Sequence, residues 1–320
     1  MLHVRVPGIQ TTLQGAPRIG TRHLGIPYSG PADDVSMALA NRLVGNGPSA
    51  TCLEITYGGF DADVEQDGSV AIAGACDRVM VSGRPVCAHE TLHLFAGDRL
   101  VISPLVHGAR TYLAVHTGFR ADWVFGASST YLPAGFGGHA GRSLKAGDHL
   151  KACGDPRRRE TLETPVDLRA VFTGSFALRA CVSAETDALD QASRTALFAA
   201  QFSAGRQATR MGLSMTGHPM ALNSDGLMKS APVFPGTIQC PPSGIPIVLL
   251  CDAQTTGGYP RIAQIARCDR HLLGQIRPGD SIRLLERTPD AAVREDAGKW
   301  ALLEHWLGYC QGNSRLIQPG

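Results

Sequence analysis

Long apolar stretches are missing from this 320-residue sequence. No run approaches the roughly 18 apolar residues that a membrane-spanning helix needs, and the longest candidate, Ile245–Cys251, has the length of a strand. The start of the sequence, Met1–Val6, carries no apolar segment of the kind found in secretory signals. We therefore expect neither membrane insertion nor export.

An excess of one charge is also missing, because 30 basic residues stand against 28 acidic ones. Proteins that bind nucleic acid or anionic membranes usually carry a marked basic surplus, so neither partner is expected. Paired cysteines are absent too. The nine cysteines are an odd number and none forms a Cys-x-x-Cys pair, which indicates reduced thiols in a cytoplasmic protein rather than a disulfide framework.

Self-contained catalytic motifs are equally scarce. The pair Gly298-Lys299 lacks the glycine loop and hydroxyl of a phosphate-binding Walker A motif, and no Gly-x-Ser-x-Gly elbow occurs. The glycines of 135–141 have the wrong spacing for a dinucleotide fingerprint. His89–His93 matches the His-Glu-x-x-His zinc pattern, but its alternation is typical of a strand, where the two histidines lie about 13 Å apart. We therefore expect no metal site.

Short apolar runs separated by glycine and proline make up most of the sequence, which predicts a mainly β fold of barrels or sandwiches. Three helices are predicted, over 35–44, 193–202 and 289–307, the first with Asp33 or Asp34 as its N-cap. A Gly-Asp pair precedes an apolar run at residues 97, 147 and 279, and such a pair favours a turn into a strand.

The length of the chain predicts two domains. The segment 153–165 holds two prolines and an arginine run, which are typical of a solvated connector. We accordingly expect a first β subdomain over 1–155 and a second one over 165–320 that ends in a helix.

Two segments, 124–148 and 251–260, are dense in glycine and hydroxyl residues. Glycine lets a ligand approach the backbone closely, and backbone amides with hydroxyls can hold a carboxylate, an amide or a phosphate. Tight turns between strands have the same composition, so the residues alone leave both interpretations open.

The same segments carry a pattern that resembles the KipA-like family, also called allophanate hydrolase subunit 2. The resemblance extends from residue 4 to about 285. It rests on these stretches: Thr11–Gln14, Arg18–Gly20, Gly25–Gly30, Asp33, Ala40–Asn46, Leu53–Thr56, Tyr112–Val115, Ser128–Tyr131, Gly137-Gly138, Gly141-Arg142, Arg210–Gly212, Gly236–Gln239, Pro241-Pro242 and Gln254–Pro260.

The resemblance implies a fold and a function. The fold is mainly β with a few helices, built as two cyclophilin-like β-barrel subdomains that form the A and B parts of a carboxyltransferase-type module. The function is that of the C subunit of an ATP-dependent 5-oxoprolinase, which hydrolyses 5-oxo-L-proline to L-glutamate together with KipI-like and LamB/YcsF-like proteins. ATP is thus an implied cofactor, and the resemblance leaves open whether partner proteins help to bind it.

Two alternatives remain open. One is a carboxyltransferase-like subunit that processes urea or allophanate, for which biotin is the implied cofactor. The other is a non-catalytic regulator that binds a KipI-like protein. The missing catalytic motifs favour the regulator, and if the chain is an enzyme subunit we expect it to be active only in a complex.

The candidate site residues follow from the motifs. Arginines suit developing phosphoryl charge, and an aspartate can act as a base, orient an amide N–H or simply cap a turn. The catalytic candidates are Asp252, Asp33 and Arg142. The candidates for binding substrate or nucleotide are Arg18, Ser29, Ser129, Thr130, Tyr131, Gly137, Gly138, Arg210, Gln254, Thr255, Thr256, Gly257, Gly258 and Tyr259.

The sequence departs from the usual family pattern at three positions. Gly15 stands where Thr-x-Gln-Asp has its aspartate. Ala127 is interpreted as replacing the arginine of Gly-Ser-Arg-Ser-Thr-Tyr, and Ala253 replaces the arginine of Asp-Arg-Gln-Thr-Thr-Gly-Gly-Tyr-Pro. Alanine cannot make the bidentate contacts of arginine, so these departures predict a change in the substrate or in the role of the chain.

Overall fold

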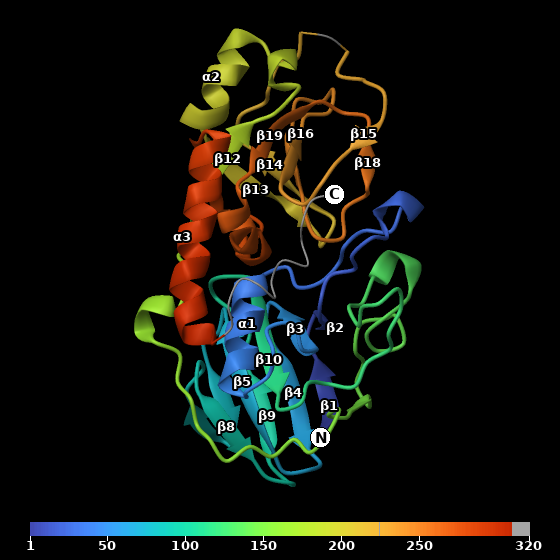
Figure 1. The fold of residues 1–320 in the computed structure, drawn as a ribbon, viewed down its shortest axis with the longest axis vertical. Helices are drawn as coiled ribbons and strands as arrows, with labels where there is room; N and C mark the ends of the chain where they lie inside the picture. The colour runs from blue at the N-terminus through green and yellow to red at the C-terminus, as the bar shows by residue number, and fades with distance from the viewer. Residues whose placement is uncertain (224, 309–320) are drawn as a thin grey trace. The chain divides into compact units, whose positions relative to one another are not determined.

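The computed structural model describes residues 1–223 and 225–308. The chain forms two compact units (Figure 1). Unit 1 comprises Met1–Arg18 and Ser29–Thr173, and unit 2 comprises Ile19–Tyr28 and the chain from Gly174 on. The segment that the sequence suggested as a connector is held on unit 1, because Pro156 and Leu162 accept hydrogen bonds from its strands. The ranges 1–155 and 165–320 stay a prediction about domains.

Unit 1 consists of two antiparallel sheets that share one apolar core, including Leu13, Ile55, Phe60 and Leu113. The first sheet has the order β11 (His149–Leu150), β1 (Leu2–Pro7), β4 (Phe60–Val64), β9 (Arg99–Ile102), β6 (Val79–Val81), β7 (Arg84–Val86). The second has the order β2 (Gln10–Gln14), β3 (Cys52–Thr56), β10 (Arg110–Val115), β5 (Gly68–Gly74), β8 (Thr91–Leu94).

Helix α1 (Asp34–Leu43) packs against β5 and β10 of unit 1. Asp33 caps it, because its carboxylate accepts a hydrogen bond from the Ser36 amide at 2.9 Å. Met37 and Leu43 of this helix are buried. The helix thus begins at the cap that the sequence predicted.

Unit 2 is built around a closed seven-stranded barrel (Figure 1). The strands run in the order β12 (Ser175–Val182), β19 (Arg261–Ile265), β16 (Thr237–Gln239), β17 (Ile247–Leu249), β14 (Gly212–Thr216), β13 (Gln201–Ala208), β20 (Ser281–Glu286). The parallel pairing of β12 with β20 closes the barrel, so it has no open sheet edge. A separate two-stranded ribbon joins β15 (Ala231–Pro232) to β18 (Thr256–Gly257).

Two α-helices belong to unit 2, α2 (Gln191–Ala199) and α3 (Pro289–Leu307), of which α2 contacts β20 and α3 contacts β12. Five 3-10 helices complete the described elements: η1 (Arg22–Leu24), η2 (Leu132–Ala134), η3 (Val166–Leu168), η4 (Thr186–Ala188) and η5 (Arg267–Gln275). None of the helices in residues 1–223 and 225–308 is long and apolar enough to span a bilayer.

The mainly β prediction is confirmed, with a closed barrel in unit 2. Each of the three Gly-Asp pairs leads into a strand, namely β9, β11 and β20. The second half of the zinc-like pattern, Thr91–His93, lies on strand β8 as its alternation predicted, whereas His89 lies outside the strand and has a left-handed backbone with φ of 65°. One boundary was wrong, since α2 ends at Ala199 and Phe202 is instead a buried residue of β13. Apolar burial of Phe202 in the barrel outweighs its place in the helical pattern.

Candidate functional site

Arg18 holds the glycine loop of unit 1, the glycine-rich segment 124–148, through contacts with its backbone. Its side chain is completely buried, and the guanidinium donates hydrogen bonds to the backbone carbonyls of Val124, at 3.2 Å, and Ser129. It also lies over the Phe136 ring, 4.8 Å from the centroid. A Cβ on Gly137 would come within 2.3 Å of the Ser129 carbonyl oxygen, so only glycine fits there. The structure therefore brings together Arg18, Ser129 and Gly137, three of the candidates for binding substrate or nucleotide.

The hydroxyls of Ser129 and Thr130 tie this loop to strand β2. The Ser129 hydroxyl accepts from the Gly15 amide at 3.0 Å and lies 2.9 Å from the Ala16 carbonyl, and the Thr130 hydroxyl donates to the Leu13 carbonyl at 2.9 Å. A Cβ on Gly138 would lie 1.8 Å from the Thr130 hydroxyl. These side chains hold the loop in place.

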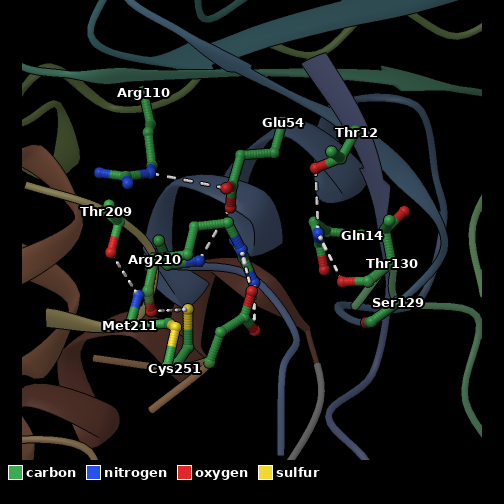
Figure 2. A network of polar contacts seen from close by, with 12 residues as sticks. Thr12, Gln14, Glu54, Arg110, Ser129, Thr130, Thr209, Arg210, Met211 and Cys251 are labelled. Atoms are coloured by element: carbon green, nitrogen blue, oxygen red, sulfur yellow. Dashed lines mark hydrogen bonds and ion pairs between the residues drawn. The ribbon is translucent and has the colours of Figure 1, made fainter. Parts of the chain in front are cut away.

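Gln14, which was not among the candidates, lies in the same cluster. Its amide nitrogen donates to the Thr12 hydroxyl at 3.0 Å and to the Thr130 carbonyl at 3.3 Å (Figure 2). Its Oε1 is buried without a hydrogen-bond partner. Thr12 and Gln14 are two apart on strand β2 and share one face, and this alternation was the signal available in the sequence.

The two departures from the family pattern that lie in unit 1 are at positions in contact with each other. When the usual Gly-Ser-Arg-Ser-Thr-Tyr is aligned with residues 126–131, its serine falls at Ala127 and its arginine at Ser128. The position that lacks the arginine is therefore Ser128, which corrects the interpretation of Ala127. A Cβ on Gly15 would lie 2.2 Å from the Ser128 hydroxyl, which itself bonds to the Thr51 hydroxyl at 2.7 Å. Gly15 and Ser128 are therefore sterically coupled.

Asp33 takes part in a buried network that fixes the start of α1. Its amide donates to the Tyr112 hydroxyl at 2.8 Å, and that hydroxyl donates to Glu54 at 2.7 Å. Arg110 lies 3.5 Å from the Glu54 carboxylate (Figure 2). Burial and the adjacent Glu54 carboxylate raise the pKa of Tyr112 well above its usual value. Asp33 thus acts as a helix cap here, and a catalytic role for it stays a prediction.

The loop before α1 includes Ser29, which has a left-handed backbone with φ of 51°. This conformation is uncommon for a residue other than glycine. Its side-chain hydroxyl is buried without a hydrogen-bond partner. Ser29 is therefore held in a strained position, as is common at binding sites.

Arg142 is paired with Asp148. Its two terminal nitrogens bond the carboxylate at 2.8 and 2.7 Å, and His139 Nε2 lies 3.4 Å from the same carboxylate. The Arg142 guanidinium lowers the pKa of Asp148 far below its usual value. This pair closes the glycine loop against the turn before β11.

Arg210 and Asp252 in unit 2 form a second bidentate pair, with Nε–Oδ2 2.8 Å and Nη2–Oδ1 3.1 Å. The Cys251 thiol contacts the Arg210 carbonyl at 3.8 Å, and the Thr209 hydroxyl accepts from the Met211 amide at 3.1 Å (Figure 2). The sequence named both charged residues but did not predict that each binds the other.

Ala253 is buried in an apolar cluster with Val233 and Leu249. An arginine at this position would have to leave the cluster or bury its charge there, and a buried unpaired charge is strongly unfavourable. The third departure from the family pattern is therefore consistent with the local packing.

The loop 254–260 is held by the buried side chain of Gln239. The Gln239 amide nitrogen donates to the Tyr259 carbonyl at 3.1 Å, and its Oε1 accepts from Gln254 Nε2 at 3.4 Å. Gly257 packs directly on Gln239, since a Cβ there would lie 2.6 Å from the Gln239 nitrogen. Gly258 lies close to the Met228 carbonyl. Thr255 and Thr256 stand between Gln254 and Gly257 in the sequence.

Comparison with known proteins agrees with this architecture. The signature described as carboxyltransferase domain, subdomain A and B, matches residues 24–286. The chain is 36% identical to the C subunit of 5-oxoprolinase from Escherichia coli over 294 residues, which span 92% of this chain and 94% of that protein. The chain belongs to the carboxyltransferase A/B domain family.

Other members of the family vary in length. The C subunit of 5-oxoprolinase from Haemophilus influenzae is 33% identical over 86% of this chain and 87% of its own length. Urea amidolyase of Saccharomyces cerevisiae is 25% identical over 92% of this chain, but only 17% of that protein is matched. The family module thus occurs both as a nearly whole chain and as part of a larger one.

Solved structures confirm the fold of this family member. The crystal structure of TTHA0988 superposes with a TM-score of 0.80 at 32% identity over 89% of this chain, which spans 55% of that protein. The K. lactis urea carboxylase structure superposes with a TM-score of 0.88 at 22% identity over 95% of this chain and 29% of that one. The second likeness concerns the fold alone.

Arg22 is a residue of this family member that the sequence did not single out. It lies in η1 on the Ile19–Tyr28 segment and donates to the carbonyls of Val233 and, at 3.1 Å, Thr255. Its guanidinium lies over the rings of Tyr28 and Phe234, 4.9 and 4.6 Å from their centroids. Burial lowers its pKa. No local motif marks this role, because its partners are more than 200 residues away along the chain.

The three arginines proposed for phosphate binding all have partners within the protein. Arg18 bonds backbone carbonyls, Arg142 bonds Asp148, and Arg210 bonds Asp252. The N-terminus of α1 is capped by a carboxylate, which repels an anion there. These residues therefore do not fit a triphosphate. In residues 1–223 and 225–308, no group of three or more His, Cys, Asp or Glu side chains is placed to hold a metal ion.

Proposed function

We propose that this chain is a subunit of an ATP-dependent 5-oxoprolinase complex, which opens the lactam of 5-oxo-L-proline to L-glutamate in the cytoplasm. The observation that carries the proposal is the 36% identity to the C subunit of the E. coli enzyme over nearly the full length of both chains. The loop clusters of the two units, each rigidly braced, support a role in binding a small polar substrate.

The chain's part in this reaction is to hold the lactam. A lactam offers one carbonyl acceptor and one N–H donor, and loops of backbone amides, hydroxyls and glutamine side chains match both groups. Because Arg18, Arg142 and Arg210 are already bonded within the chain, ATP binds on a partner protein in this proposal. The partners are a KipI-like and a LamB/YcsF-like protein.

A second candidate function is carboxyl transfer to urea or a related amide. The similarity to yeast urea amidolyase over 92% of this chain favours it. Carboxylated biotin would then be the implied carboxyl donor. Both candidate reactions use an amide that carries an N–H, so the same loops serve either substrate.

Reconstitution tests the proposal. The chain is mixed with its KipI-like and LamB/YcsF-like partners, ATP and 5-oxoproline are added, and glutamate and ADP are measured while each protein is omitted in turn. We expect glutamate to form only when all three are present. A stable complex that forms no glutamate, or glutamate formation that does not need this chain, would contradict it, and carboxylation of urea with a biotin carboxylase is the assay for the second candidate.

A further inference from the structure

The buried glutamine of the unit 2 barrel determines which end of a second glutamine faces outward. Gln239 lies on β16 with 2% of its surface exposed, and it contacts the loop 254–260 through both ends of its amide. Gln254 is exposed and starts that loop. The two side chains and the Tyr259 carbonyl form one chain of hydrogen bonds.

The order of donors and acceptors in this chain is determined at one end. The Tyr259 carbonyl can only accept, so the Gln239 group that faces it, at 3.1 Å, must be the NH2. The other end of Gln239 is then the carbonyl oxygen, which needs a donor, and Gln254 Nε2 supplies it at 3.4 Å. Gln254 Oε1 is therefore the end of that side chain that is not bonded to Gln239.

Two further contacts hold the loop in this arrangement. Gly257 lies against Gln239, and a Cβ at this position would displace the Gln239 amide, 2.6 Å away. Arg22 binds the Thr255 carbonyl at 3.1 Å, next to Gln254 in the chain. The backbone that follows Gln254 is thus anchored at two points.

We infer that Gln254 is a specificity-determining residue that accepts a hydrogen bond from the N–H of an amide, lactam or urea substrate, and that Gln239 is the positioning residue that keeps its oxygen outward. An outward oxygen attracts an N–H donor and disfavours a carboxylate or phosphate, because two acceptors repel. The inference deepens the proposed function and rests on it for the identity of the substrate.

Binding to the assembled complex without ATP tests the inference by calorimetry. The probes are 5-oxo-L-proline and its N-methyl derivative, together with urea and tetramethylurea. We expect N-methylation to weaken binding about tenfold in the unaltered protein, since one hydrogen bond is lost. Gln254→Leu should weaken binding of the parent compounds to the same extent and abolish the discrimination against N-methylation.

Gln239→Met should give a similar loss, and Gln239→Met combined with Gln254→Leu should be no worse than Gln254→Leu alone, because Gln239 acts through Gln254. Gln264→Met is the matched control. It removes another barrel glutamine, one that bonds the Pro235 carbonyl instead of the loop 254–260, and should leave the discrimination unchanged. Gln254 is exposed, so its variant tests the inference even if Gln239→Met folds poorly.

Equal binding of the parent and N-methyl compounds by the unaltered protein would overturn the inference, as would additive losses from Gln239→Met and Gln254→Leu, or no binding of either parent compound. Failure of the proposed function gives a different result. In that case 5-oxoproline yields no glutamate in the reconstituted complex, while the binding of urea still depends on its N–H groups and on Gln254.

Discussion

Arg210 and Asp252 neutralise each other inside unit 2, with 4% and 2% of their side chains exposed. The pairing is bidentate, so the carboxylate accepts from two nitrogens of one guanidinium. Both carboxylate oxygens of Asp252 are thus already engaged within the protein. The pair therefore has an architectural role that any catalytic role of Asp252 must accommodate.

Breaking this pair should destabilise the protein strongly. We expect Asp252→Asn or Arg210→Met to lower the free energy of unfolding by about 3–5 kcal/mol, because each removes one member of a buried ion pair. Urea unfolding of the purified chain measures this. Asp155→Asn is the control, since the exposed Arg157–Asp155 pair should contribute little. If Asp252→Asn and Arg210→Met lower the stability as little as Asp155→Asn does, the Arg210–Asp252 pair does not stabilise the fold.

Gly137 should be irreplaceable in the unit 1 loop. Gly137→Ala brings a Cβ within 2.3 Å of the Ser129 carbonyl oxygen, and backbone cannot move aside as a flexible side chain can. Gly126→Ala is the matched control, because both glycines have a φ of 73° but nothing lies within 4 Å of a Cβ at Gly126. We expect about 1–2 kcal/mol from backbone strain alone in Gly126→Ala and a clearly larger loss in Gly137→Ala. Equal melting temperatures of the two variants would refute the steric argument.

Gly15 and Ser128 should show non-additive effects. Gly15→Ala places a methyl group 2.2 Å from the Ser128 hydroxyl, so we expect a loss of about 1–3 kcal/mol by overpacking. Ser128→Gly removes that hydroxyl. A double-mutant cycle by thermal unfolding should show that Gly15→Ala is tolerated much better in the Ser128→Gly background. Losses that simply add would mean that the two positions are independent.

His89 should make the stability of unit 1 depend on pH. Burial, aided by the charge of Arg169, lowers its pKa from 6.5 to about 4. The unfolded chain therefore binds a proton at a higher pH than the folded chain. Above pH 6.5 His89 is neutral in both states and the protein keeps its full stability. As the pH falls towards 4, the unfolded chain takes up the proton first, and the free energy of unfolding falls by a total of roughly 3 kcal/mol.

His89→Asn tests this dependence, because asparagine tolerates the φ of 65° at this position. Urea unfolding at neutral pH and at a pH of about 4.5 should show a larger loss of stability for the unaltered protein than for the variant. The same pH dependence in both proteins would assign the effect to other groups.

The sequence predicted those features of the fold that depend on neighbouring residues. The cap at Asp33, the Gly-Asp turns and the strand that includes Thr91–His93 all depend on residues a few positions apart. The start of β13 was missed, because the helical pattern continues to Phe202 while the barrel draws that ring into its core.

The candidate site was predicted less completely, for a physical reason. Motifs identified Arg18, Arg210 and Asp252 as residues, but the partner of each is distant in the chain, as with Arg18 and Ser129, which are 111 positions apart. A charged residue has the same letter whether it is available to a substrate or neutralised inside the fold. Arg22 and Gln239 were missed because their contacts, and not their sequence context, give them a role.

The placement of Ile19–Tyr28 in unit 2 has a consequence for synthesis of the chain. Arg22 leaves the ribosome early, but its acceptors, Val233 and Thr255, follow 211 and 233 residues later. Contacts so distant in sequence form late, since the intervening chain must first be closed into a loop. Until Val233 has been synthesised, the Ile19–Tyr28 segment therefore lacks both carbonyl acceptors of Arg22, so its place in unit 2 is fixed only late in synthesis.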